Sequence, residues 1–183
     1  MSMTQTLPDD AARNRPGFDA VRRFLEKAIG LLINPGRFYE ARKDEKGYRT
    51  AISFLLTVSI LFTLAGALVM PQEKAFFAVV FFLNAFSMPF LTAGILYPVA
   101  RLFCRRTFTF EALFRIVAYA NVSLLISWLP GMAWVGGIWK FYLIGVGMTR
   151  TGGIKTRVVL ACLAAAAVLL LLLIHLLKPL ISA

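Results

Sequence analysis

Five long apolar stretches separated by short polar turns dominate this chain. We expect helices at about 50–70, 75–103, 110–128, 132–149 and 157–177. About 20 residues at a rise of 1.5 Å match a hydrocarbon thickness near 30 Å, so each stretch is long enough to cross a bilayer. Charged residues make up 16% of the 183 positions, against roughly 25% in soluble domains. The sequence therefore predicts an all-α polytopic membrane protein whose five-helix domain covers residues 49–178.

The positions of the basic residues predict how these helices are oriented. If all five stretches cross, 17 of the 20 Lys and Arg residues fall on one side, and the exceptions are Lys74, Lys140 and Lys178. By the positive-inside rule the N-terminus lies in the cytoplasm and the C-terminus outside. The net charge of +11 then indicates attraction to anionic headgroups, and we expect no nucleic-acid partner.

The N-terminal 48 residues divide into two parts. Residues 1–17 are polar and without periodicity, which predicts a disordered tail. Residues 18–48 begin with an amphipathic helix whose apolar positions recur at helical spacing. This helix lies either on the bilayer interface or on the protein's own cytoplasmic surface, and the sequence leaves both arrangements open. The basic residues expected at lipid headgroups are Arg22, Arg23, Lys27, Arg105 and Arg106.

Lys140 is the charged residue expected deepest in the bilayer. It lies ten residues from both Pro130 and Arg150, so its Cα should lie about 15 Å from either end of its helix. A charge at that depth costs roughly 2.5–3.5 kcal/mol even on insertion scales, and such residues usually face a bundle interior or a wet cavity. The polar residues expected near the same level are Asn84, Ser87, Tyr119 and Asn121.

Two interpretations of this midplane cluster remain open. It is either a hydrogen-bonded network that fixes helix packing, or a cavity that binds an anionic group or passes a proton or ion. No carboxylate is expected at its level. Glu111 belongs to the cytoplasmic boundary, where it can pair with Arg115 one helical turn later.

Small residues suggest a packing face on the fourth stretch. Ala133 and Gly137 form a small-xxx-small pair, which favours close packing inside the monomer or a homodimer seam. The two cysteines, Cys104 and Cys162, are interpreted as apolar filler without a disulfide.

Catalytic motifs are missing from the sequence. A single histidine excludes the HExxH zinc pattern, and there is no GxSxG, Walker A or GxGxxG motif. Every Asp lies at or before Asp44, so paired intramembrane aspartates are excluded. We expect a protein that is not an enzyme and has no catalytic residues, cofactor or metal site.

Three segments resemble elements of the bacterial Yip1-domain proteins. The segment LLINPGRFYEARKDEKG, from Leu31 to Gly47, is similar to the family's NP-x-x-F element, with Asn34, Pro35 and Phe38 at the motif positions. The segments at 114–120 and 129–147 resemble its Tyr-containing element and its LPG hairpin. Val122 and Ser123 stand where relatives often carry a proline, so the sequence provides no proline kink there.

The resemblance implies a multi-pass protein of the bacterial inner membrane. Eukaryotic relatives are associated with Rab GTPases, but no GTPase-binding surface is recognisable here and that partner is not carried over. We expect a non-enzymatic scaffold or adaptor that organises membrane lipids, with a protein partner or a homo-oligomer. The alternative is a small transporter, channel or lipid-moving protein that uses the cluster around Lys140.

Overall fold

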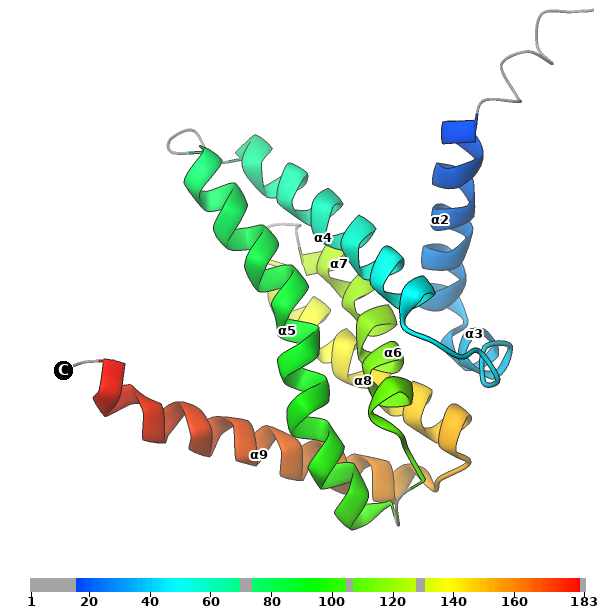
Figure 1. The fold of residues 1–183 in the computed structure, drawn as a ribbon, viewed down its shortest axis with the longest axis vertical. Coiled ribbons are helices and arrows are strands. Elements are labelled where there is room, and N and C mark those ends of the chain that lie inside the picture. The colour runs from blue at the N-terminus through cyan, green and yellow to red at the C-terminus, as the bar shows by residue number, and fades with distance from the viewer. Residues whose placement is uncertain (1–15, 70–73, 105–106, 128–130, 182–183) are drawn as a thin grey trace, which may run out of the picture.

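The computed structural model describes residues 16–69, 74–104, 107–127 and 131–181, which form helices joined by turns without any strand (Figure 1). The predicted tail at 1–17 and the basic turn at Arg105 and Arg106 lie wholly or mostly outside these residues. The helices are α2 (Pro16–Ile33), α3 (Pro35–Glu40), α4 (Arg49–Val69), α5 (Lys74–Phe103), α6 (Phe110–Ala120), the 3₁₀ turn η1 (Asn121–Ser123), α7 (Leu124–Ser127), α8 (Ala133–Gly152) and α9 (Thr156–Ile181).

Helix α6 forms the centre of the bundle. It contacts α4 and α5 on one side and α8 on the other, and every residue from Leu113 to Ala120 is buried. Thr109 caps its first turn by accepting a hydrogen bond from the backbone N–H of Ala112 at 3.2 Å. Because α6 is surrounded by helices, its polar side chains must find partners within the protein.

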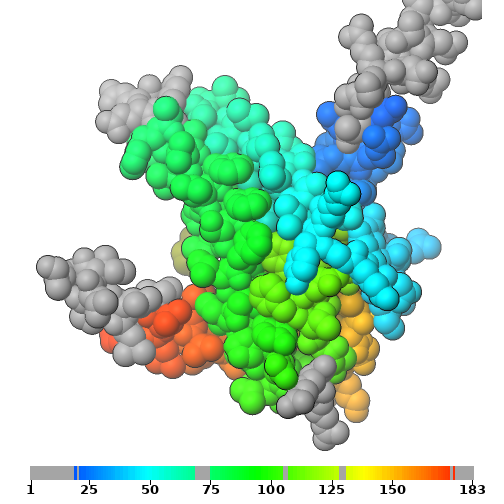
Figure 2. Space-filling view, viewed as in Figure 1, coloured from blue at the N-terminus to red at the C-terminus, as the bar shows by residue number. Residues whose placement is uncertain are grey.

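Four cations of the described residues lie at one end of the bundle, and we call it the basic end. Arg101 lies near the end of α5 and Arg150 near the end of α8, while Lys155 and Arg157 lie at the beginning of α9. Helix α9 packs on α5 and α8 near this end and then diverges from the bundle (Figure 1). In the space-filling view the α4–α5 hairpin and α9 project separately from the body (Figure 2).

The third apolar stretch changes helix type halfway along. Helix α6 gives way to the 3₁₀ turn η1 at Asn121, and the α-helix resumes in α7. The change occurs without a proline, at the residue whose side chain bonds the backbone of α5. Short 3₁₀ segments within a helix often mark such local constraints.

The N-terminal helices pack against the bundle. The ring of Phe24 in α2 lies 5.3 Å from that of Phe54 in α4, and Ala28 and Leu31 are buried. Helix α3 packs against α8, and the Tyr39 hydroxyl donates to the Ile116 carbonyl oxygen at 3.1 Å. Of the two arrangements left open by the sequence, α2 therefore makes the contact with the protein's own surface.

Only part of the apolar face of α2 is used in this contact. Val21, Leu25, Ile29 and Ile33 are exposed at intervals of four residues and lie next to the docked positions around the helix. These four side chains therefore form an exposed apolar strip that can contact another apolar surface.

Within the described parts of the chain, four helices are long and apolar enough to cross a membrane by length and composition. They cover Arg49–Leu68, Ala75–Phe103, Phe110–Ser127 and Thr156–Leu173, the third of these joining α6, η1 and α7. Helix α8 has sufficient length, but Lys140, Arg150, two tryptophans and several glycines reduce its mean hydropathy. Large exposed apolar surfaces on α4, α5 and α9 suit contact with lipid.

Candidate functional site

Lys140 is the donor at one end of a chain of hydrogen bonds that joins three elements. Its Nζ lies 3.0 Å from Oδ1 of Asn121 in η1, and Nδ2 of Asn121 donates to the carbonyl oxygen of Ala85 in α5 at 3.1 Å. Asn121 is 0% exposed and Lys140 is half-buried. The amide dipole of Asn121 thus links the ammonium group to the backbone of another helix, which offsets part of the cost of removing the charge from water.

A glycine allows α8 to approach η1 closely enough for this bond. A Cβ at Gly136 would overlap Oγ of Ser127 and lie 3.0 Å from the carbonyl oxygen of Ser123. Ser127 Oγ itself donates to that carbonyl at 3.2 Å. The close contact lies one helical turn before Lys140, so it sets the distance between Lys140 and Asn121.

The other residues expected in the midplane cluster point elsewhere. Asn84 and Ser87 are exposed on α5, and the carbonyl that reaches the cluster belongs to Ala85 instead. Tyr119 donates its hydroxyl hydrogen to Oε2 of Glu45 at 3.1 Å. Since residues two apart on a helix point in very different directions, Tyr119 and Asn121 serve separate sites.

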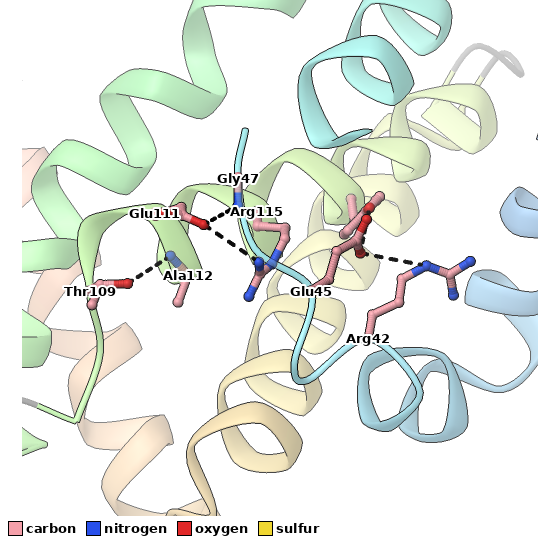
Figure 3. Close-up of polar contacts among 8 residues, drawn as sticks. Arg42, Glu45, Gly47, Thr109, Glu111, Ala112 and Arg115 are labelled. Carbon is pink, nitrogen blue, oxygen red and sulfur yellow. Dashed lines mark hydrogen bonds and ion pairs between the residues drawn. The ribbon is translucent and has the colours of Figure 1, made fainter. Parts of the chain in front are cut away.

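A second polar site ties the segment before α4 to α6 (Figure 3). Glu45 accepts the Tyr119 hydrogen bond and lies 3.9 Å from Nε of Arg42. On the same segment, the backbone N–H of Gly47 donates to Oε1 of Glu111. Gly47 has a φ of 89°, a left-handed conformation that favours glycine, so the turn that presents this N–H depends on the residue type.

Arg115 lies beside this boundary site and is only 7% exposed. Its Nη1 is 3.8 Å from Oε1 of Glu111 and has no hydrogen-bond partner among the described residues. The predicted i,i+4 pair is thus present as a long contact, with Glu111 shared between Arg115 and Gly47. The Arg115 guanidinium is buried and incompletely paired, so the Glu111 carboxylate stabilises it. Loss of that carboxylate would leave a buried charge without compensation.

The sequence did not reveal Glu45 and Gly47 as partners of α6, or Arg42 as the neighbour of Glu45. Glu45 is a carboxylate between two lysines just before a helix, a position that on its own suggests only a solvated charge. The signal that the sequence offered was the place of Glu45 within the segment that resembles the NP-x-x-F element, two residues before Gly47. The distance of 74 residues between Glu45 and Tyr119 hides their contact from any local pattern.

The motif residues of that segment build the contact between α3 and the bundle. Pro35 begins α3 directly after Asn34, where proline suits the first helical turn. The buried ring of Phe38 packs edge-on against Tyr119 at 5.2 Å, and the Arg42 guanidinium lies 4.0 Å from the Phe38 centroid. Burial raises the pKa of the neighbouring Tyr39 hydroxyl well above its usual range, which keeps it a donor.

One known protein family matches most of this chain. The family model of the Yip1 domain matches residues 29–177, from the end of α2 into α9. The chain belongs to the Yip1 family. No curated protein and no solved structure matches it. The matched region of this Yip1-domain protein includes both polar sites and excludes most of α2.

The predicted headgroup residues of the Yip1-domain protein are in two settings. Arg22 pairs with Glu26 on the surface of α2 at 2.9 Å. Arg23 and Lys27 line a cleft of about 510 Å³ between α2 and α3, together with Arg37 and Arg42. Arg105 and Arg106 are outside the described residues.

Small residues of the Yip1 domain fall into two groups. Ala133 and Gly137 are exposed, and a Cβ at Gly137 would have no neighbour within 4 Å. The close approaches are made by Gly136, Gly147 and Gly152 instead. The Cys104 and Cys162 thiols are buried and free, and the described residues hold no cluster of three His, Cys, Asp or Glu side chains for a metal ion.

Proposed function

We propose that this Yip1-domain protein is a non-enzymatic membrane scaffold that couples the lipid surface to the basic end of its helix bundle. The observation that supports this is the divided apolar face of α2. Phe24, Ala28 and Leu31 pack on the protein, while Leu25 and Ile29 are exposed. An amphipathic helix held in this way can insert its free strip into a leaflet while remaining fixed to the bundle.

The connection from α2 to the bundle is short and specific. Only Asn34 separates α2 from α3, and α3 packs on α8. Tyr39 then bonds the backbone of α6, and Glu45 bonds Tyr119. A change in how α2 sits in the membrane would therefore act on the central helix rather than on a loose tail.

We further propose that α8 is the fifth span. Its one central charge, Lys140, has Asn121 as a partner, and charged residues within membranes are tolerated when they pair inside the bundle. With five spans, the basic end faces the cytoplasm of a bacterial inner-membrane protein by the positive-inside rule.

The environment of Lys140 favours the scaffold over the transporter. Its ammonium donates a hydrogen bond to Asn121, and Lys140 does not line the groove between α3, α8 and α9, although that groove touches Phe141 on the same helix. A transporter or channel using the Lys140 cluster remains the second candidate, because a lysine at this depth is unusual.

The scaffold proposal is tested by the depth of α2 in a bilayer. Single-cysteine variants Ile29→Cys and Arg23→Cys would be made in the full chain with Cys104 and Cys162 changed to Ser, labelled with a fluorophore and placed in vesicles. We expect lipid-borne quenchers to act on the label at 29 and a water-soluble quencher to act on the label at 23. Quenching of both labels equally from water would contradict the insertion of α2.

A further inference from the structure

A groove lies between α3, α8 and α9. It has a volume of about 890 Å³. Helices α8 and α9 meet at the basic end (Figure 1). Residues of both helices line the groove. Its two ends differ in chemistry.

The end at the turn between α8 and α9 is polar and cationic. Asn34, Thr149, Arg150 and Thr156 line it. Lys155 and Arg157 flank Thr156 and are exposed. Arg150 is therefore the cation that lines this end, and two more exposed cations lie beside Thr156 in the sequence.

One carboxylate lies near these cations. Oε2 of Glu40 is 3.9 Å from Nη1 of Arg150, and both side chains are more than half exposed. A surface pair at this distance contributes little, so Arg150 is available to a stronger anion. Gly36 lies beside the guanidinium, and a Cβ there would be in ordinary van der Waals contact with Nε of Arg150, at 3.5 Å.

The other end of the groove is apolar. Ile138, Phe141, Leu160 and Ala164 line it without a charged side chain. Ile138 and Arg150 are twelve residues apart on α8, which corresponds to about 18 Å along the helix. That length is comparable to one leaflet of a 30 Å hydrocarbon core.

We propose that this groove binds one anionic phospholipid, with its phosphate at Arg150 and an acyl chain along Ile138, Phe141 and Leu160. Charge complementarity supports a lipid as the occupant, because the cation that lines the groove lies at its polar end and the rest is apolar over the length of one acyl chain. The proposal rests on the proposed role in organising lipids, and it names the class of lipid and its site.

The test measures lipid retained by the purified full-length protein. Detergent-solubilised protein would be incubated with phosphatidylglycerol or phosphatidylcholine of identical chains, and bound lipid counted by native mass spectrometry. We expect about one phosphatidylglycerol per chain and about a tenfold preference over phosphatidylcholine, the size of effect typical of a charge-assisted hydrogen bond. Arg150→Gln should abolish the preference.

Two controls distinguish lipid binding in this groove from a general effect of positive charge and from loss of folding. Arg157→Gln removes an exposed cation next to Thr156 that does not line the groove, so the preference should persist. Ala164→Trp fills the apolar end from an exposed position and should reduce retention of both lipids, whereas Ala161→Trp, exposed on the same helix but away from the groove, should not.

Three results of the lipid measurement would overturn the proposal. They are equal retention of both lipids by the wild type, equal effects of the two arginine changes, and unchanged binding in Ala164→Trp. Dimers in place of bound lipid would assign the groove to a second copy and also overturn it. The insertion of α2 is measured separately by fluorescence quenching. A negative result for lipid binding in the groove would therefore not contradict the scaffold proposal.

Discussion

At the scale of single residues, the Lys140–Asn121 bond has unequal partners. Removing the cation leaves a neutral amide oxygen without its donor, whereas removing the amide leaves a largely enclosed cation and frees the Ala85 carbonyl. The second loss is the larger, because an uncompensated charge costs more than an unpaired neutral group.

We therefore expect Lys140→Met to destabilise the folded protein by about 1 kcal/mol and Asn121→Leu by about 3 kcal/mol. The double variant should be more stable than Asn121→Leu alone. Unfolding of the purified protein in detergent checks this order. Unchanged stability of Lys140→Met, combined with loss of an ion or lipid flux measured in vesicles, would favour the transporter instead.

The depth of a residue could be inferred from sequence, but its direction could not. Counting from Pro130 and Arg150 placed Lys140 and Asn121 at one level, and they are bonded. The same count placed Tyr119, Asn84 and Ser87 nearby, yet Tyr119 faces Glu45 and the other two are exposed on α5. Direction depends on which face of each helix meets a neighbour, and that is set by tertiary packing.

At the scale of elements, the helices were predictable and their contacts were less so. The length of an apolar stretch and the polar turns that bound it are local properties of the sequence. Helices α4, α5, α8 and α9 accordingly lie over the predicted stretches. The docking of α3 joins segments far apart in sequence, so no local pattern reveals it. Similarly, Gly136 and Gly137 are neighbours in sequence, but only Gly136 meets another element closely.

Gly147 provides a test of this packing. A Cβ there would lie 2.6 Å from Cγ2 of Ile116 and 3.0 Å from the Tyr39 ring, so it would strain both the α6 and the α3 contacts of α8. We expect Gly147→Ala to destabilise the protein by about 1–3 kcal/mol, as overpacking of a close contact does.

Gly137→Ala is the matched control for Gly147→Ala. It adds the same methyl group to the same helix with open space around it, so helix propensity should make it neutral or slightly stabilising. Thermal unfolding of the two variants in one detergent gives the comparison. Equal effects would contradict the packing of α3 and α6 on α8. A change of oligomeric state in Gly137→Ala alone would indicate a seam between copies.

At the scale of the whole molecule, α8 decides where the two ends of the chain lie. Five spans are an odd number and place the termini on opposite sides of the membrane, whereas four spans place them on the same side. Composition alone identifies four candidate helices, because Lys140 counts against α8. The pairing of Lys140 with Asn121 is the reason to include it.

We expect a tag at the N-terminus to be protected, and a tag at the C-terminus to be cleaved, when protease is added outside intact bacterial spheroplasts producing the protein. Lysed spheroplasts provide the control in which both tags are cleaved. Protection of both tags in intact spheroplasts would mean that α8 does not span.

The long separation between Tyr39 and the carbonyl it bonds, 77 residues later in the chain, has a consequence for synthesis. While the ribosome is still making the first hairpin, neither α6 nor α8 exists, so α2 cannot yet make its contacts with the bundle. If α2 lies on the membrane as proposed, its whole apolar face would first contact lipid, and part of it would pass to the protein once the third helix has been inserted. The exposed strip of α2 in the finished protein would then be the part of that face that stays in contact with lipid.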